Sequence, residues 1–278
     1  MKKPPQLYNI AHRGARSLAP ENTMTGFAKA WQVGAHGVET DVSVTGDGAL
    51  ILFHDPNLRR TTDVARIFPQ RQHDPLHTFS HEDIKKLDAG SWFVKSDPFG
   101  SIADGSITAA EAGSMRHAHI PALEELLFFV KAHSWFVNIE IKRLPRELAS
   151  FAIVEEILKI IDKVELAPAR FSISSFEHSY LYRLQNLRPE VEINALIGED
   201  PGKPQSWGNY EFEIYNANID LIDSLQIEEA RRRGCRINLY TVNRVEEMKH
   251  YLAQEGIDKI ITDYPQLLTL FRNSRNGC

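Results

Sequence analysis

Short apolar segments rich in β-branched residues alternate with segments of helical periodicity along most of the 278-residue chain. A strand needs about 4–8 residues of this kind, whereas an amphipathic helix repeats its apolar positions every three or four residues over a longer stretch. The predicted strands are Tyr8–His12, Val38–Val42, Phe136–Lys142, Phe171–Ser175, Ile193–Ile197, Asp220–Asp223, Ile237–Val242 and Lys259–Thr262. The predicted helices are Thr23–Val33, Leu123–His133, Pro145–Asp162, His178–Asn186, Ile227–Arg233 and Val245–Glu255.

This alternation of strand and helix is typical of an α/β protein with a parallel sheet. Eight such strands in a chain of 278 residues predict a closed (β/α)8 TIM barrel, with residues 1–278 forming a single domain. An open, doubly wound sheet is the alternative, because the predicted strands near residues 193 and 220 are weak.

One pair of segments departs from the parallel pattern. Residues 38–44 and 49–54 are separated only by the turn sequence Thr45-Gly46-Asp47-Gly48. Parallel neighbours need a connection of about a dozen residues or more, so these segments are predicted to form an antiparallel hairpin with Asp-Gly in its turn. Counting from the turn places His54 opposite Glu39, to within one or two residues.

The barrel periodicity is interrupted between about residue 55 and residue 120. Connections in compact domains are usually about 4–6 residues long, so this segment is more than a loop. It contains a short helical pattern at Ser80–Asp88 and the aromatic pair Trp92 and Phe93. We therefore predict an inserted small subdomain over the mouth of the barrel.

The composition limits which binding partners and which cellular compartment are expected. The formal net charge of −5 gives no overall basic surface for nucleic acid or anionic lipid. The first ten residues lack the apolar run of a secretory signal, and no segment reaches the roughly 20 apolar residues of a transmembrane helix. The two cysteines, Cys235 and Cys278, do not suggest a disulfide framework. We expect a cytoplasmic protein that acts on a small molecule.

Carboxylates gather on two of the predicted strands. Glu39 and Asp41 lie two residues apart and therefore point to the same side, as do Glu140 and Lys142. At the carboxyl ends of barrel strands such residues line the active-site face. Converging carboxylates repel one another unless a cation is present, and oxygen ligands suit Mg²⁺ or Ca²⁺. Glu39, Asp41 and Glu140 are the predicted metal ligands; the alternative is that they are surface groups or form ion pairs.

His12 and His54 are the candidate acid–base pair. His12 ends the first predicted strand, and the hairpin brings His54 beside a carboxylate. Histidine titrates near neutral pH, so one ring can accept a proton from a nucleophile while another donates a proton to a leaving group. The alternative for each histidine is a metal ligand or a hydrogen-bonded structural group.

An ordered set of short motifs adds a resemblance to these observations. Each motif is weak by itself, but together they resemble the glycerophosphodiester phosphodiesterase family closely from Ile10 to Leu268. The motifs are His12-Arg13-Gly14, Pro20-Glu21-Asn22-Thr23, Glu39-Thr40-Asp41, Asp47-Gly48, His54-Asp55, Ile120-Pro121-Ala122-Leu123-Glu124-Glu125, Glu140-Ile141-Lys142, Ser175-Phe176, Thr241-Val242-Asn243 and Thr262-Asp263-Tyr264-Pro265.

The resemblance implies a (β/α)8 barrel like that of phosphatidylinositol phospholipase C. It also implies hydrolysis of glycerophosphodiesters to sn-glycerol 3-phosphate and an alcohol, with Mg²⁺ or Ca²⁺. Tyr240 departs from the family, which usually has tryptophan before Thr-Val-Asn, and it is expected near the glycerol moiety. The implied roles are His12 and His54 as general acid and base, Glu39, Asp41 and Glu140 as metal ligands, Arg13 and Lys142 on the phosphate, and Glu21 and Asn22 as residues that orient the site and bind substrate.

Three other functions compete with this interpretation. A lysophospholipase D or a sphingomyelinase-D-like enzyme on the same barrel would receive an acyl chain, for which Phe68, Trp92, Phe93 and Phe99 are candidates unless they pack the insertion onto the barrel. A non-catalytic binding protein would have lost the histidines and acids, which are all present. A sugar-phosphate isomerase or aldolase would favour a phosphate cup late in the chain, where Thr262–Pro265 is not glycine-rich.

Overall fold

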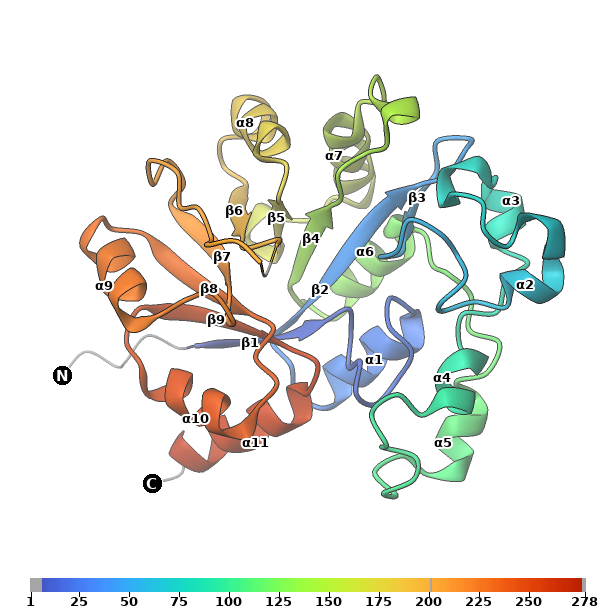
Figure 1. The fold of residues 1–278 in the computed structure, drawn as a ribbon, viewed down its shortest axis with the longest axis horizontal. Coiled ribbons are helices and arrows are strands. Elements are labelled where there is room, and N and C mark those ends of the chain that lie inside the picture. The colour runs from blue at the N-terminus through green and yellow to red at the C-terminus, as the bar shows by residue number, and fades with distance from the viewer. Residues whose placement is uncertain (1–6, 201, 277–278) are drawn as a thin grey trace.

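Eight parallel strands form a closed barrel in the computed structural model, which describes residues 7–200 and 202–276. Each strand pairs with two neighbours, and the pairing of the first strand with the second closes the ring (Figure 1). The barrel strands are β1 (Tyr8–His12), β2 (Gly37–Val44), β4 (Val137–Ile141), β5 (Phe171–Ser175), β6 (Glu192–Ile197), β7 (Ile214–Asn218), β8 (Arg236–Tyr240) and β9 (Ile257–Thr262).

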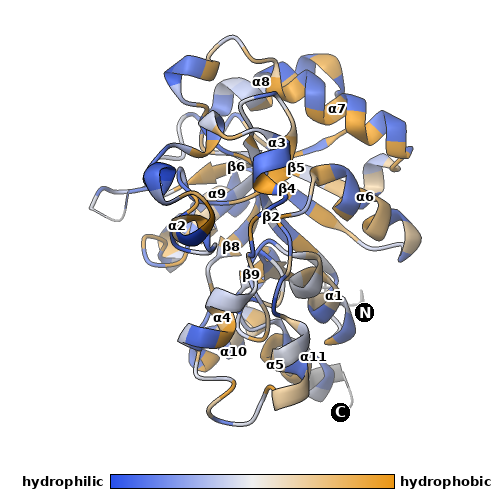
Figure 2. Cartoon of the chain, turned by 90° about the vertical axis from the view of Figure 1, so that its right-hand side faces the viewer, coloured by the Kyte–Doolittle hydropathy of each residue, from blue (hydrophilic) through white to orange (hydrophobic). Residues whose placement is uncertain are grey.

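Helices surround the barrel and cover its outer face (Figure 1). Helix α7 shows why they dock: its apolar residues recur every three or four positions and are buried, while Glu155 and Glu156 are partly exposed. Hydrophobic and hydrophilic residues alternate along this helix in Figure 2. Among the described residues, no helix combines the length and apolar character needed to cross a membrane. The outer helices are α1 (Met24–Gln32), α6 (Leu123–Ala132), α7 (Ile153–Val164), α8 (His178–Leu187), α9 (Ser224–Arg232), α10 (Val245–Ala253) and α11 (Pro265–Asn276), with the 3-10 helices η3 (Arg146–Leu148) and η4 (Pro168–Arg170).

The predicted TIM barrel is therefore confirmed, and the open-sheet alternative is wrong. The prediction of a strand at Asp220–Asp223 is also wrong, because the seventh barrel strand is Ile214–Asn218. Asp223 instead begins helix α9, where its side chain accepts a hydrogen bond from the backbone N–H of Gln226. Aspartate at such a position caps a helix better than it fits a strand, and the sequence pattern did not distinguish the two.

The predicted hairpin is present. Strand β3 (Leu50–Leu52) runs antiparallel to β2 and pairs Leu52 with Val42. Extending this register places His54 opposite Thr40, one residue from the predicted position. The shift arises because Ala49 belongs to the turn, where its carbonyl accepts a hydrogen bond from the backbone N–H of Thr45.

The segment between β3 and α6 contains only short helices, which lie together on one side of the barrel (Figure 1). Its first part builds an apolar core of its own around Phe79 and Ile84, together with Ile51 and Phe53 of the hairpin region. Its second part joins the core of the barrel through apolar side chains such as Phe93. The short helices are α2 (Val64–Ile67), η1 (Pro69–Arg71), η2 (Leu76–Thr78), α3 (His81–Ile84), α4 (Ser91–Ser96) and α5 (Ala109–Ser114).

A close backbone approach shapes the loop that follows β1. Gly14 has a φ of +94°, and a Cβ atom there would lie 2.8 Å from the carbonyl carbon of Gly26 in α1. A side chain at position 14 would therefore push the loop away from α1. The glycine therefore lets the loop that carries Arg13 pack closely against α1 at the carboxyl end of β1.

Candidate active site

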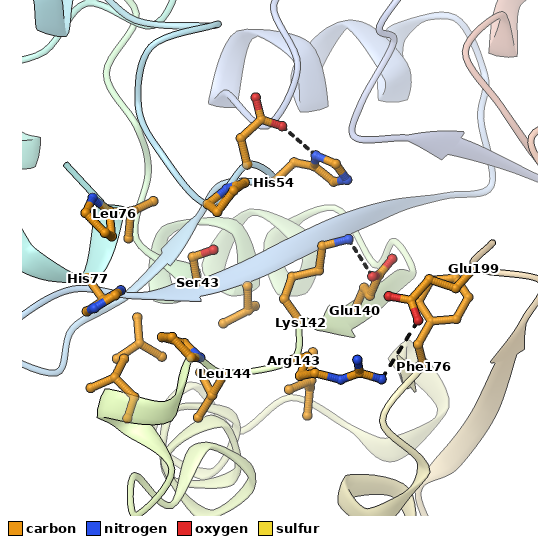
Figure 3. A pocket seen from close by; sticks show the side chains of 18 of the residues that line it. Ser43, His54, Leu76, His77, Glu140, Lys142, Arg143, Leu144, Phe176 and Glu199 are labelled. Atoms are coloured by element: carbon orange, nitrogen blue, oxygen red, sulfur yellow. Dashed lines mark hydrogen bonds and ion pairs between the residues drawn. The ribbon is translucent and has the colours of Figure 1, made fainter. Parts of the chain in front are cut away.

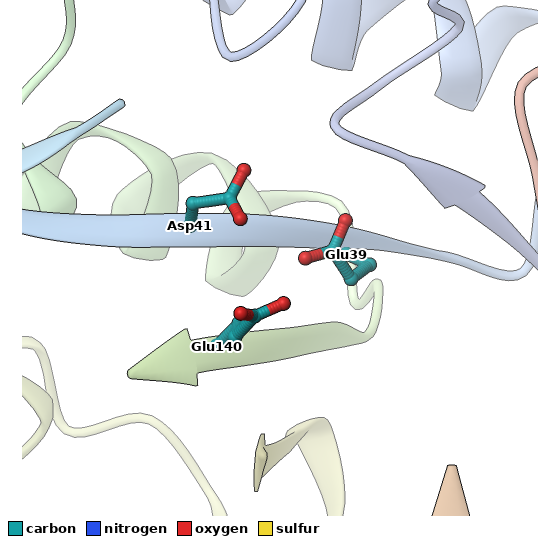
Figure 4. Close-up of side chains that lie close together, drawn as sticks. All are labelled: Glu39, Asp41 and Glu140. Atoms are coloured by element: carbon teal, nitrogen blue, oxygen red, sulfur yellow. The ribbon is translucent and has the colours of Figure 1, made fainter. Parts of the chain in front are cut away.

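Three carboxylates converge at the carboxyl ends of β2 and β4. Asp41 and Glu140 are direct partners in the register of the two strands, and Glu39 lies two residues before Asp41 on the same face. One oxygen from each of the three side chains lies within 4.8 Å of the others (Figure 4). Glu39 and Asp41 are buried, and the side chain of Glu140 is 12% exposed.

The electrostatics of these acids fit a divalent cation. Burial, reinforced by the charges of Asp41 and Glu140, raises the pKa of Glu39 well above its usual value. Burial also raises the pKa of Glu140, with a further contribution from Asp41. Among the described residues, the buried Oε1 of Glu39 has no hydrogen-bond partner. A hard cation such as Mg²⁺ or Ca²⁺ would satisfy that oxygen and offset the repulsion, because both ions prefer oxygen ligands.

Two cations border the carboxylates. The Nζ atom of Lys142 lies 2.6 Å from Glu140 Oε1 and 3.2 Å from Asp41 Oδ1. The Nε atom of Arg13 lies 3.2 Å from Asp41 Oδ2, and its backbone N–H donates to Glu39 Oε2 over 3.1 Å. Burial alone would raise the pKa of Asp41, but Lys142 and Arg13 hold it well below its usual range. The site therefore keeps at least one ionised acid beside two fixed positive charges.

Glu21 and Asn22 lie behind this cluster and line neither of the two cavities described below. The Nδ2 of Asn22 donates to Asp41 Oδ2 over 2.9 Å, while its Oδ1 accepts from Thr40 Oγ1 over 2.8 Å. These bonds fix the carboxylate of Asp41.

Glu21 connects three arginines. Its carboxylate accepts hydrogen bonds from Arg13, Arg16 and Arg60 over 2.6–3.1 Å. Burial would raise the pKa of Glu21, but Arg60, Arg13 and Arg16 lower it to about 2. Glu21 is therefore a buried, ionised hub.

His12 is held by a carboxylate that is remote in sequence. Its Nδ1 lies 2.7 Å from Asp263 Oδ1, so its Nε2 faces the acidic cluster, 4.0 Å from Glu39 Oε2. Asp263 immediately follows β9 and also accepts hydrogen bonds from Arg16 and from Asn243 Nδ2. Asp263 is not among the site residues predicted from the sequence, although a carboxylate directly after the last barrel strand is placed to face the active site.

His54 is held by its neighbour. The Nδ1 of His54 lies 2.7 Å from Asp55 Oδ1, and Asp55 in turn accepts hydrogen bonds from Arg60 over 2.5 and 3.0 Å. Both histidines thus have Nδ1 engaged by a carboxylate, an arrangement that fixes the orientation of the ring and leaves Nε2 available.

Two adjoining cavities open onto these residues. The smaller, which we call the central cavity, has a volume of about 170 Å³. It is lined by His12, Arg13, Glu39, His54, Asn138, Glu140, Lys142, Ser174, Phe176, Leu196, Asn216, Tyr240, Thr241 and Ile261. The structure therefore brings both histidines, two of the three acids and both cations to one small space.

The larger, which we call the side cavity, has a volume of about 1080 Å³ and mostly apolar walls. His54, Glu140, Lys142, Phe176 and Tyr240 line both cavities, so the two are continuous. From there the side cavity extends to Leu76 and Leu144 at its other end (Figure 3). The hydroxyl of Tyr240 donates to the carbonyl of Ile197 over 2.7 Å, which fixes this ring in the shared wall.

The aromatic residues considered for an acyl chain do not line the side cavity. Phe93 is fully buried, and Trp92 packs against the same core and donates its Nε1–H to Ala89 O. Phe68 packs against Phe79 in the separate core of the insertion, and Phe99 contacts Tyr264. They are packing residues.

The chain matches a known family over nearly its whole length. Residues 12–267 match the model described as the Glycerophosphoryl diester phosphodiesterase family. A glycerophosphodiester phosphodiesterase from Caldanaerobacter subterraneus is 32% identical over 263 residues, which cover 93% of this chain and 95% of the relative. A glycerophosphoinositol inositolphosphodiesterase from Homo sapiens is 41% identical over 285 residues, which cover 97% of this chain but 48% of the relative. The chain thus spans about half the length of this mammalian relative.

Solved structures show the same fold. A phosphodiesterase from Oleispira antarctica, determined in complex with the product sn-glycerol-3-phosphate, is similar with a TM-score of 0.77 and 24% sequence identity over 97% of both chains. A glycerophosphodiester phosphodiesterase from Agrobacterium tumefaciens is similar with a TM-score of 0.70 and 24% identity, over 95% of this chain and 100% of the other.

Proposed function

The chain belongs to the glycerophosphoryl diester phosphodiesterase family, and on that basis we propose that it hydrolyses glycerophosphodiesters to sn-glycerol 3-phosphate and an alcohol. The observation that carries this proposal is the convergence of two carboxylate-held histidines, two cations and two of the three clustered acids on one cavity of about 170 Å³. The Oleispira antarctica relative, in complex with sn-glycerol-3-phosphate, supports the choice of product.

Glu39, Asp41 and Glu140 would hold a divalent cation, either Mg²⁺ or Ca²⁺. When bound, that cation would supply positive charge to a non-bridging phosphate oxygen and so stabilise the transition state. Arg13 and Lys142 line the central cavity and add two further positive charges, which bind the phosphate and share its developing negative charge. Asn22 holds Asp41 in place.

His12 and His54 divide the proton transfers. One accepts a proton from the attacking oxygen, of water or of the glycerol 2-hydroxyl, as that oxygen bonds to phosphorus, and the other protonates the departing alcohol oxygen as its bond to phosphorus breaks. Attack by the 2-hydroxyl gives a cyclic phosphate, which water then opens to sn-glycerol 3-phosphate with the two histidines in exchanged roles. Asp263 and Asp55 keep each Nδ1 engaged, so that Nε2 is the atom that exchanges the proton. Glu21 supports both pairs through its arginines, and Tyr240 forms part of the wall beside the glycerol.

The test is a ³¹P NMR assay of glycerophosphocholine with Mg²⁺, Ca²⁺ or EDTA. We expect the signal of sn-glycerol 3-phosphate to grow with either metal and not with EDTA. The Glu39→Gln variant should lose most activity and bind the metal more weakly in calorimetry. A phosphocholine signal, or an unchanged rate in EDTA, would contradict the proposal.

A lysophospholipase D activity is the second candidate, and the side cavity favours it. Its volume of about 1080 Å³ exceeds the roughly 300–1,000 Å³ typical of small-molecule sites, and its walls are mostly apolar. An acyl chain would lie along Leu76 and Leu144 rather than in the insertion. Turnover of lysophosphatidylcholine beside glycerophosphocholine separates the two activities. Leu144→Asp, at a partly exposed position of the cavity wall, should impair only the turnover of lysophosphatidylcholine.

A further inference from the structure

The inside of the barrel contains a layer of buried asparagines where bulky apolar residues are usual. Asn138, Asn194, Asn216 and Asn238 come from β4, β6, β7 and β8, and each is at most 3% exposed. Burying a carboxamide without hydrogen bonds costs free energy, so each amide should have partners. Asn138 is an example, because its amide bonds with Ser172, Ser174 and Asn194.

Asn216 is different from the other three. Its Oδ1 accepts a hydrogen bond from Asn238 Nδ2 over 2.8 Å, but its own Nδ2 has no partner among the described residues. Asn216 also lines the central cavity. Asn194 and Asn238 each have an Oδ1 without a partner in the described part of the chain as well, but neither residue lines that cavity. Asn138 does line it, but both atoms of its amide are already engaged.

We propose that Asn216 is a specificity-determining residue whose carboxamide binds a hydroxyl group of the glycerol moiety inside the barrel. This inference rests on the proposed phosphodiesterase function and assigns the glycerol to the central cavity. The buried Nδ2 of Asn216 can donate to a hydroxyl oxygen that reaches it from the central cavity, because a hydroxyl group accepts as well as donates. A diester that lacks the hydroxyl leaves the buried amide unpaired, and the site discriminates against it for that reason.

The shapes of the two cavities agree with this assignment. The central cavity holds about 170 Å³ and has polar side chains on its walls, including Ser174 beside Asn216, so it suits a small polyol. The side cavity is several times larger and most of its wall is apolar, so it encloses a glycerol less closely even though polar side chains such as Ser43 and Arg143 also line it. A diester bound across the junction would place its phosphate near Glu140 and Lys142, which line both.

The test compares two diesters with the same leaving group: glycerol 3-(4-nitrophenyl phosphate) and ethyl 4-nitrophenyl phosphate. The wild-type protein should prefer the glycerol diester in kcat/KM. Asn216→Ala should lower that preference about tenfold, the size expected for one buried hydrogen bond and its unpaired partner. Asn194→Ala, which removes an equally buried amide from a strand next to β7, is the matched control and should keep the wild-type preference.

A product-inhibition measurement on the wild-type protein covers the case in which Asn216→Ala does not fold. We expect sn-glycerol 3-phosphate to inhibit at about tenfold lower concentration than ethyl phosphate. Equal inhibition by the two, or an equal loss of activity on both diesters in Asn216→Ala, would overturn the assignment of Asn216. Failure of the wild-type protein to cleave either diester would instead overturn the proposed function.

Discussion

The two histidine–carboxylate pairs have the same local geometry but are built in different ways. In both, Nδ1 lies 2.7 Å from a carboxylate oxygen. His12 and Asp263 are 251 residues apart, meet because β1 and β9 are neighbours in the closed barrel, and are 15% and 6% exposed. His54 and Asp55 are adjacent in sequence and are 31% and 17% exposed. One pair therefore depends on barrel closure and burial, and the other on the conformation of one short segment.

The two pairs share a support. Arg16 contacts both Asp263 and Glu21, and Arg60 contacts both Asp55 and Glu21. The carboxylate of Glu21 thus connects the buried pair to the more exposed pair through one arginine on each side. We infer that the two histidines are positioned by one continuous network.

The largest effect should follow from removing either histidine. We expect His12→Ala and His54→Ala each to lower kcat on glycerophosphocholine about 100- to 10,000-fold, the usual contribution of a general acid or base. His178, which lines neither cavity and bonds to the carbonyl of Leu196, provides a control variant, His178→Ala. Near wild-type turnover in either active-site variant would remove that histidine from the mechanism.

The two supporting carboxylates should differ in their effect. Asp263→Asn should reduce kcat about 100-fold, because His12 and Asp263 are the less exposed pair and water replaces the lost carboxylate less readily there. Asp55→Asn should reduce kcat only about tenfold, because water can reach the more exposed His54 and its partner. Steady-state kinetics of the two variants at one pH provide the comparison. Equal losses would show that burial does not distinguish the pairs.

Acid should weaken the shared support. The pKa of Glu21 is lowered to about 2 in the folded protein from a usual value of 4.5, so the unfolded chain takes up the proton first. The stabilisation is complete above about pH 4.5 and is lost as the pH falls toward about 2, with a size on the order of 3 kcal/mol. Urea unfolding should find Glu21→Gln less stable at pH 7 and nearly equal to wild type near pH 2.

The control for that experiment is Glu246→Gln, because Glu246 is an exposed residue of α10. The unfolding free energy of the Glu246→Gln variant should equal that of the wild-type protein at both pH values. A Glu21→Gln deficit that stays constant from pH 7 to pH 2 would contradict the assigned role of the ionised carboxylate.

The smallest effect should come from Arg60. Arg60→Ala removes hydrogen bonds to Asp55 and to Glu21 but leaves Asp55 beside His54, so kcat should fall only about three- to tenfold. Arg60→Lys should recover part of the loss if charge is what matters. Arg59→Ala is the neighbouring control, since the guanidinium of Arg59 bonds to the exposed His73. A loss as large as that of His54→Ala would mean that Arg60 acts on the substrate directly.

The contrast between a local and a long-range histidine pair also explains which site residues could be predicted from the sequence. Glu39, Asp41 and Glu140 were recognisable because residues two apart on a strand share a face, and adjacent strands bring such faces together. His54 could be placed near the carboxylates because the hairpin turn is short, so the register of its two strands can be counted from the sequence. These inferences use only local geometry.

Contacts between segments that are far apart in the sequence could not be predicted from local geometry. Asp263 meets His12 only because the barrel closes with β9 beside β1. The local periodicity of the sequence does not show which distant strands become neighbours. The contact of Arg60 with Glu21 depends on the path of the insertion back to the barrel. The seventh strand was misplaced because the apolar residues Leu221 and Ile222 lie in the connection between β7 and Asp223, which caps α9.

The most direct test of the two-histidine account varies the leaving group. His12→Ala and His54→Ala are each assayed on glycerophosphocholine and on glycerol 3-(4-nitrophenyl phosphate), whose leaving group needs no protonation. The variant that lacks the general acid should recover most of its activity on the nitrophenyl diester, and the variant that lacks the general base should not. Equal recovery of both variants, or recovery of neither, would contradict the division of the two proton transfers between His12 and His54.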